Sequence, residues 1–227
     1  VLQVTHFFKS ATAIAMTAIL AGCSVKPLPL DPSVGDTGQP LSAVALKSDV
    51  QFYDLSLEVF PDNKRIKGVS KTQFKMLSAS QFVELKLDSR FLITAITSDD
   101  KTLNYTRNAG VLNIDLGKQY AAGSTVSVAV AYEGNPHIAK NAPWDGGFVF
   151  AETENGEPWI ATAVQGEGCD LFWPCKDHFA DKADSMRIRL TVPNGLSAVT
   201  NGVLQSVKPV GANKQQFDWL LSVPASD

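Results

Sequence analysis

Histidine is scarce in this sequence, because the 227 residues include only His6, His137 and His178. No H-E-x-x-H segment occurs, so the common helical zinc site is absent. His137 and His178 could meet in the folded chain, but two histidines without a shared spacing more often satisfy a loop than bind a metal. We therefore predict no metal site in this chain.

Other catalytic patterns are missing as well. The sequence has no G-x-S-x-G nucleophile turn and no P-loop. The formal net charge is −3 and the pI is about 5.6, so the chain lacks the strongly basic character of nucleic-acid-binding domains. We expect no nucleic-acid partner and no complete catalytic machinery in this chain.

Long apolar runs are absent, apart from a short one near the N-terminus. "SATAIAMTAILAGC" follows Lys9 and is too short to span a membrane, which is typical of a secretory signal. Its last four residues, Leu20 to Cys23, match a bacterial lipobox, in which the cysteine is lipidated and becomes the new N-terminus. We predict a lipoprotein signal at residues 1–22 with lipidation of Cys23. The alternative is an ordinary signal peptide cut near Ala21.

The residue after Cys23 indicates the destination of the lipoprotein. Ser24 stands where an Asp would signal retention in the inner membrane. We expect a lipid-anchored protein of the bacterial cell envelope, at the outer membrane and facing the periplasm or the exterior. Residues 23–47 are rich in Pro, Gly, Ser and Asp, and we predict a tether there.

Cysteine is also rare, and only Cys169 and Cys175 remain once Cys23 is lipidated. The pair lacks the second pair of ligands that a structural zinc site requires. In an oxidising compartment the two could form a disulfide, or they could be two buried thiols. The sequence leaves both alternatives open.

No convincing amphipathic helix occurs before Gly134, and alternation of period two dominates from residue 50 onward. Tyr53, Leu55 and Leu57 alternate with polar residues, so Gln51–Met76 is predicted to form a hairpin around "PDNKR". "CKDHFADKAD" is expected to form a short helical turn. Further strands are predicted over "FVELKLD", "LITAITSDD", "KTLNYTR", "GVLNIDLG", "STVSVAVAYEG", "FVFAE", "PWIATAV", "SMRIRLTVP", "SAVTNGVLQSVKPV" and "KQQFDWLLSVP". Residues 48–227 are therefore expected to form an all-β domain of antiparallel strands, as a sandwich or an open curved sheet.

The segment "VQGEGCDLFWPCKD", residues 164–177, has a composition that no strand requires. Gln165 and Glu167 offer oxygen acceptors to a cationic group such as an ammonium. Gly166 and Gly168 would allow a ligand to approach the backbone closely. The alternative is a tight connection in which the glycines only permit the turn.

These residues resemble the N-terminal domain of the zinc aminopeptidases that include aminopeptidase N and leukotriene hydrolase. The family pattern T-x-x-[EQ]-x8-P-x-x-D matches Thr162, Gln165, Pro174 and Asp177. The following strand, Met186–Pro193, and Asn201-Gly202 also match, and "APWDGGFVF" resembles the family upstream. The resemblance covers roughly residues 48–227 and implies a saddle-shaped β domain.

The resemblance also implies a function shared between two domains. Gln165 would bind the free α-amine of a peptide substrate, beside Gly166 and Glu167. The next domain, absent from this chain, would supply the zinc ligands, so zinc belongs to the full-length enzyme and this chain alone is expected to be inactive. The expected partners are a peptide with a free N-terminus, the missing catalytic domain and the membrane.

Two other functions remain open from the sequence. A lipid-anchored β-sandwich could bind a glycan or a protein through Trp144, Trp159 and Trp173, without any enzyme activity. A packing domain without a ligand of its own is the third interpretation.

Overall fold

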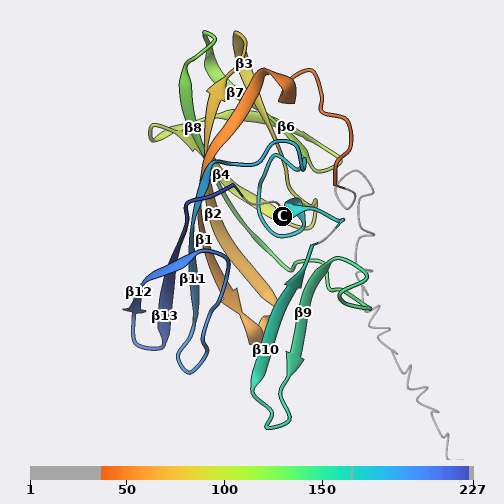
Figure 1. Cartoon of the computed structure of the whole chain (residues 1–227), viewed down its shortest axis with the longest axis vertical. Coiled ribbons are helices and arrows are strands. Elements are labelled where there is room, and N and C mark those ends of the chain that lie inside the picture. Colours follow the sequence, from red (N-terminus) through yellow and green to blue (C-terminus); the bar gives the residue numbers. More distant parts are fainter. Residues whose placement is uncertain (1–36, 165, 225–227) are drawn as a thin grey trace, which may run out of the picture.

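The computed structural model describes residues 37–164 and 166–224 (Figure 1). Within these ranges the chain forms strands and short 3-10 helices, and no α-helix. The strands are β1 (Ser48–Phe60), β2 (Arg65–Met76), β3 (Ser80–Lys86), β4 (Leu92–Ser98), β5 (Lys101–Thr102), β6 (Asn104–Asn108), β7 (Val111–Tyr120), β8 (Thr125–Gly134), β9 (Gly147–Glu152), β10 (Pro158–Ala163), β11 (Ser185–Pro193), β12 (Val203–Val210) and β13 (Lys214–Leu221). The 3-10 helices are η1 (Ala45–Lys47), η2 (Pro61–Asn63) and η3 (Cys169–Leu171). The predicted all-β fold is confirmed.

The predicted first hairpin is present, with β1 and β2 paired antiparallel from Ser48↔Met76 to Phe60↔Arg65. The turn between them begins with Pro61 and ends at Lys64, which adopts the left-handed conformation with φ of 47°. Every second residue of β2 is buried, because that face of the strand packs on the core.

The largest sheet has eight strands in the order β12-β13-β11-β1-β2-β8-β4-β5. Most neighbours are antiparallel, as predicted, but β1 and β11 are parallel over Phe52↔Ser185 to Glu58↔Thr191. The sequence analysis expected antiparallel strands and did not include this one parallel pair. The chain leaves β8 through a long excursion, residues 135–184, and returns along the free edge of β1 in the same direction.

Two smaller sheets complete the domain. One has the order β3-β7-β6, and the other is the hairpin of β9 and β10, whose strands were predicted over "FVFAE" and "PWIATAV". The core cluster contains side chains of the large sheet and of β3 and β7, so these two sheets enclose it as a sandwich. Its fully buried members include Phe74, Leu85, Ile114 and Val128.

Residues 37–47 lie on the domain, although the predicted tether spans residues 23–47. The Thr37 hydroxyl donates a hydrogen bond to Asp177 Oδ1 at 2.6 Å. The Ser42 hydroxyl donates one to Glu84 Oε2 at 2.7 Å, and Ala45 is buried. The C-terminal part of the predicted tether therefore belongs to the folded body. The signal peptide at residues 1–22 and Cys23 lie outside the described residues, and no helix of the described ranges is long and apolar enough to span a bilayer.

The short helical turn predicted over "CKDHFADKAD" is wrong as a helix. Residues 175–184 form a loop with one reverse turn, in which the Asp181 N–H donates to the His178 carbonyl at 3.0 Å. Lys176 and Asp177 are both buried in contacts with distant elements. These tertiary contacts hold the backbone extended and prevent it from coiling.

Candidate functional site

The segment after β10 forms a tight turn, and the carbonyl of Val164 is the acceptor of its hydrogen bonds. The Val164 carbonyl accepts hydrogen bonds from the N–H groups of Glu167 and Gly168, each at 3.0 Å. Gly166 and Gly168 have positive φ, 84° and 100°. A Cβ at Gly168 would lie 2.3 Å from Asp177 Oδ1, so only glycine fits there. Gln165 lies outside the described residues, and its role stays a prediction.

The chain after this turn is fixed by a disulfide between Cys169 and Cys175, whose Cα atoms are 6.2 Å apart. The sequence left a disulfide and two thiols open, and the structure has the disulfide. Cys175 also forms a bridge with Lys86 of β3, through hydrogen bonds of 2.7 and 3.1 Å. The disulfide therefore connects η3 to the edge of the three-stranded sheet.

Aromatic side chains of residues 172 and 173 pack this segment against the core. The Trp173 ring meets Tyr53 of β1 edge-on with centroids 4.5 Å apart. Phe172 meets Phe148 of β9 with centroids 5.8 Å apart, and the Phe172 carbonyl accepts the Tyr132 hydroxyl at 2.8 Å. Trp173 is only 7% exposed, so it cannot serve as a surface anchor for a glycan or a protein.

Two buried charged residues stabilise this segment, and the sequence analysis named only one of them, Asp177, as part of the family pattern. Lys176 Nζ donates to the Ser48 carbonyl at 2.5 Å and forms an ion pair with Asp181. Asp177 accepts the Thr37 hydroxyl and faces Lys86 Nζ at 3.5 Å. The only signal for these contacts was the charge density of "CKDHFADKAD", which does not reveal distant partners.

The loop before β9 packs against the candidate turn. A Cβ at Gly146 would lie 2.5 Å from Glu167 Cβ, so the backbone there passes directly beside the Glu167 side chain. Burial lowers the pKa of His137 in this loop, and the positive charge of Arg90 lowers it further. His178 stacks on Phe179 instead, with ring centroids 4.8 Å apart. Across residues 37–164 and 166–224, no group of three His, Cys, Asp or Glu side chains is arranged to hold a metal ion. The described residues therefore do not fit a zinc site.

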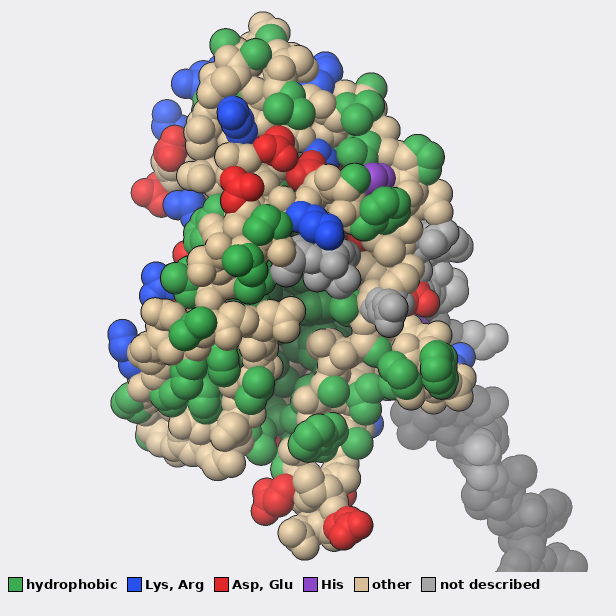
Figure 2. All heavy atoms as spheres, viewed as in Figure 1, with side chains coloured by type: hydrophobic (Ala, Val, Ile, Leu, Met, Phe, Trp, Pro, Cys, Tyr) green, Lys and Arg blue, Asp and Glu red, His purple; other side chains and the backbone are tan. Residues whose placement is uncertain are grey.

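A large apolar hollow lies between the eight-stranded sheet and the β9–β10 hairpin (Figure 2). Its volume is about 870 Å³. The lining comes mainly from β1, β10, β11 and the loop of residues 195–201. A strand was predicted over "SMRIRLTVP", and its alternate residues Met186, Ile188, Leu190 and Val192 all line this hollow.

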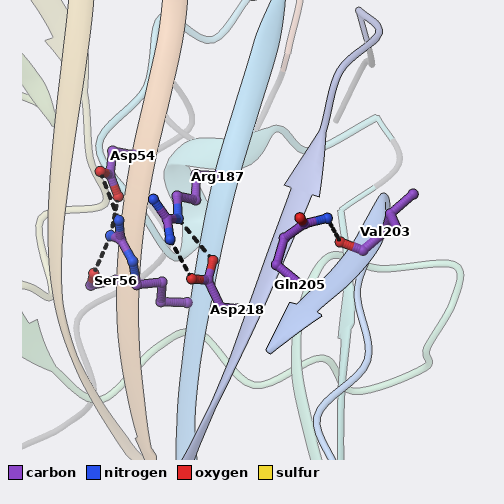
Figure 3. A network of polar contacts seen from close by, with 7 residues as sticks. Asp54, Ser56, Arg187, Val203, Gln205 and Asp218 are labelled. Carbon is purple, nitrogen blue, oxygen red and sulfur yellow. Dashed lines mark hydrogen bonds and ion pairs between the residues drawn. The ribbon is translucent and has the colours of Figure 1, made fainter. Parts of the chain in front are cut away.

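The opposite face of the sheet is charged (Figure 3). Arg187 donates through Nε to Asp218 Oδ1 at 2.9 Å, and Arg189 donates through Nη2 to Asp54 Oδ2 at 3.1 Å. The hydrogen bond from Arg187 lowers the pKa of Asp218. The sheet is therefore amphipathic, with ion pairs on one face and the apolar hollow on the other.

Known proteins resemble this chain in sequence pattern and in fold. Residues 50–226 match the family model of the peptidase M1 N-terminal domain. A two-domain M1 zinc metallopeptidase mutant bound to L-arginine superimposes with a TM-score of 0.65 at 22% identity, over 85% of this chain and 43% of that one. An M1 zinc metallopeptidase from Deinococcus radiodurans gives a TM-score of 0.66 at 22% identity, with the same coverages. A comparison with curated proteins found no match.

This chain thus spans less than half the length of these solved peptidases. At such identities the superposition shows a shared fold, whereas the family model covers most of the sequence. The resemblance drawn from Thr162, Pro174 and Asp177 is confirmed at the level of the family. The chain belongs to the peptidase M1 N-terminal domain family, and residues 50–226 form that domain.

Proposed function

We propose that this chain is the substrate-recognition domain of a lipid-anchored zinc aminopeptidase. In this role Gln165 binds the α-ammonium group of a peptide substrate and sets cleavage after the first residue. A carboxamide oxygen accepts a charge-assisted hydrogen bond from an ammonium, which is stronger than a bond between neutral groups. Gly166 has no side chain that would block the approach of the substrate, and Glu167 adds a carboxylate near the ammonium group.

The observation that supports this proposal is the tight turn closed on the Val164 carbonyl. It is anchored by buried neighbours on its C-terminal side, including Asp177 and the disulfide at Cys169. The described residues of a turn fixed in this way lose little backbone entropy when a ligand binds.

Zinc would be held by a second domain. M1 metallopeptidases are zinc enzymes by name, and the described residues of this chain do not fit a zinc site. A bound zinc ion would activate water and polarise the scissile carbonyl. This chain would hold the substrate's N-terminus, and we expect it to hydrolyse no peptide by itself.

The anchor is a separate part of the proposal. Lipidation at Cys23 would place the enzyme at the outer membrane of the bacterial envelope, facing the periplasm or the exterior. A Cys23→Ala variant should then appear in the soluble fraction when the unaltered protein sediments with membranes. Equal partition of both proteins would contradict the anchor.

The recognition role is tested by replacing Gln165 with Ala in the polypeptide that carries both domains. We expect the KM for aminoacyl substrates to rise about tenfold or more, the effect of losing one charge-assisted hydrogen bond. Gln205→Ala on β12 is the matched control, because Gln205 is exposed and its amide donates to the carbonyl of Val203 on its own strand (Figure 3). A KM that barely changes for Gln165→Ala would show that the assigned role is wrong.

A further inference from the structure

Residues 37–47 lead into β1 and, at their N-terminal end, contact the candidate recognition turn. In Figure 1 they form the orange segment between the grey N-terminal trace and β1. The backbone N–H of Thr37 donates a hydrogen bond to the Gly166 carbonyl at 3.3 Å. The Thr37 hydroxyl donates to Asp177 Oδ1 at 2.6 Å, across 140 residues of sequence. Thr37 is therefore bonded both to the turn and to the loop that follows the disulfide.

Asp177 connects Thr37 to the far side of the turn. Its side chain is fully buried, and its Oδ2 faces Lys86 Nζ at 3.5 Å. The oxygen that accepts the Thr37 hydroxyl, Oδ1, lies 2.3 Å from the position that a Cβ at Gly168 would take. The carboxylate thus lies directly against the Gly168 backbone, and Thr37 and Lys86 hold it in that place.

The backbone at Gly166 needs a contact of this kind. Gly166 has a φ of 84°, and within the described ranges only its chain neighbours lie within 4 Å of the position that a Cβ there would take. Glycine loses more backbone freedom on ordering than any other residue, so a hydrogen bond from a distant segment restricts it considerably. Gly166 directly follows Gln165, so the bond from Thr37 acts on the backbone beside the proposed amine-binding residue.

The rest of the N-terminal segment is also bound to the domain. The Ser42 hydroxyl donates to Glu84 Oε2 of β3 at 2.7 Å and accepts the Ala45 N–H at 3.0 Å. Gly38 packs on the ring of Phe179, because a Cβ there would lie 2.4 Å from Phe179 Cε1. These contacts bring Thr37 to the turn as the end of an anchored segment.

We infer that Thr37 is a positioning residue for the substrate amine, and that residues 37–45 form a clasp on the recognition turn. This inference rests on the proposed function, because Gln165 is the group that is positioned. The clasp restrains the Gly166 carbonyl and the Asp177 carboxylate together, so the turn keeps one backbone conformation before a peptide binds. Such preorganisation reduces the entropy lost on binding. Without the clasp the N-terminus of the peptide is bound more weakly, whereas the chemical step is unaffected.

The kinetic test compares Thr37→Val with Thr37→Ser in the polypeptide that carries both domains. Valine keeps the shape of threonine and removes the hydroxyl, whereas serine keeps the hydroxyl. We expect Thr37→Val to raise the KM for aminoacyl substrates about threefold to tenfold, the effect of losing one hydrogen bond to a charged group, with kcat unchanged. Thr37→Ser should retain the original KM. Thr106→Val, at an exposed position on β6, is the matched control and should change neither constant.

Hydrogen exchange of the 227-residue chain tests the clasp without any activity. The N–H groups of Glu167 and Gly168 donate to the Val164 carbonyl, so their exchange reports opening of the turn. Thr37→Val should accelerate exchange at these two amides severalfold and leave the amides between β1 and β2 unchanged. An equal acceleration throughout the domain would indicate a general loss of stability and would overturn the inference.

Two kinetic results would also overturn it. One is an unchanged KM for Thr37→Val in an enzyme whose KM rises with Gln165→Ala. The other is a Thr37→Ser variant as impaired as Thr37→Val, since the hydroxyl would then not be the group that matters. A failure of the proposed function has a different signature. In that case neither Gln165→Ala nor Thr37→Val changes the KM, while Thr37→Val still accelerates exchange at Glu167 and Gly168, so that the clasp is structural only.

Discussion

The Tyr53 hydroxyl accepts the backbone N–H of Lys176 at 3.0 Å, while the Tyr53 ring meets Trp173 edge-on. One side chain of β1 thus holds both sides of the loop that contains Pro174 and Cys175. Tyr53 is itself buried, so water cannot replace either contact.

Replacing Tyr53 with Phe keeps the ring and removes the acceptor. The buried Lys176 N–H then has no partner, which should lower the free energy of unfolding by about 1–3 kcal/mol. Urea unfolding measures this change. Tyr105→Phe, at an exposed position on β6, is the control and should have no effect. Equal stability of the two variants would mean that the hydroxyl does not support the loop.

The disulfide stabilises the domain by restricting the unfolded chain. Its loop is short, with a sequence separation of 6. Replacing both Cys169 and Cys175 with Ala should therefore cost about 2 kcal/mol, near the lower end of the usual range. Thiol titration of the denatured, unreduced protein should find no thiol from these two cysteines. Two free thiols from this pair would contradict the bridge.

Gly68 has no room for a side chain. A Cβ there would lie 2.6 Å from the hydroxyl oxygen of Tyr132. Burial raises the pKa of Tyr132, so its hydroxyl stays protonated and donates to the Phe172 carbonyl. Gly68→Ala should displace this ring and destabilise the domain by about 1–3 kcal/mol. Lys67→Ala, at an exposed neighbouring position, should change stability much less in the same thermal melts.

The ion pair between Arg187 and Asp218 makes the free energy of unfolding depend on pH. The pKa of Asp218 is lowered in the folded state, mainly by the hydrogen bond from Arg187. The stabilisation is therefore complete above the ordinary carboxyl pKa near 4 and is lost as the pH falls through the lower folded value. Asp218→Asn should cost about 1 kcal/mol at pH 7, since Arg187 is partly exposed. Its stability should converge with that of the unaltered protein in strong acid, and a constant difference from pH 7 to pH 2 would rule out this linkage.

Alternation of apolar residues was sufficient to locate most strands, because one face of each strand packs on the core. The strand predicted over "SMRIRLTVP", for example, is β11, Ser185–Pro193. The parallel pairing of β1 with β11 could not be predicted in this way. Periodicity describes a strand's own faces, and the partner at its edge depends on the path of the intervening chain.

Only one feature of the candidate site could be predicted from the sequence, namely the turn that its two glycines allow. Glycine adopts positive φ without steric cost, so two glycines close together indicate a turn, and both Gly166 and Gly168 have positive φ. The burial of Trp173 and the exposure of Trp159 could not be read from the sequence, since both depend on which distant elements pack nearby. The helical turn expected after Cys175 was wrong for the same reason, because Lys176 bonds to Ser48.

The most direct test of the central claim compares two inhibitors of the polypeptide that carries both domains. One is an amino-acid amide with a free amine, and the other is its N-acetylated analogue. If Gln165 binds the ammonium group, Gln165→Ala should weaken inhibition by the free amine about tenfold or more and leave the analogue unchanged. An equal effect on both inhibitors, or none on the free amine, would contradict recognition of the substrate amine by this domain.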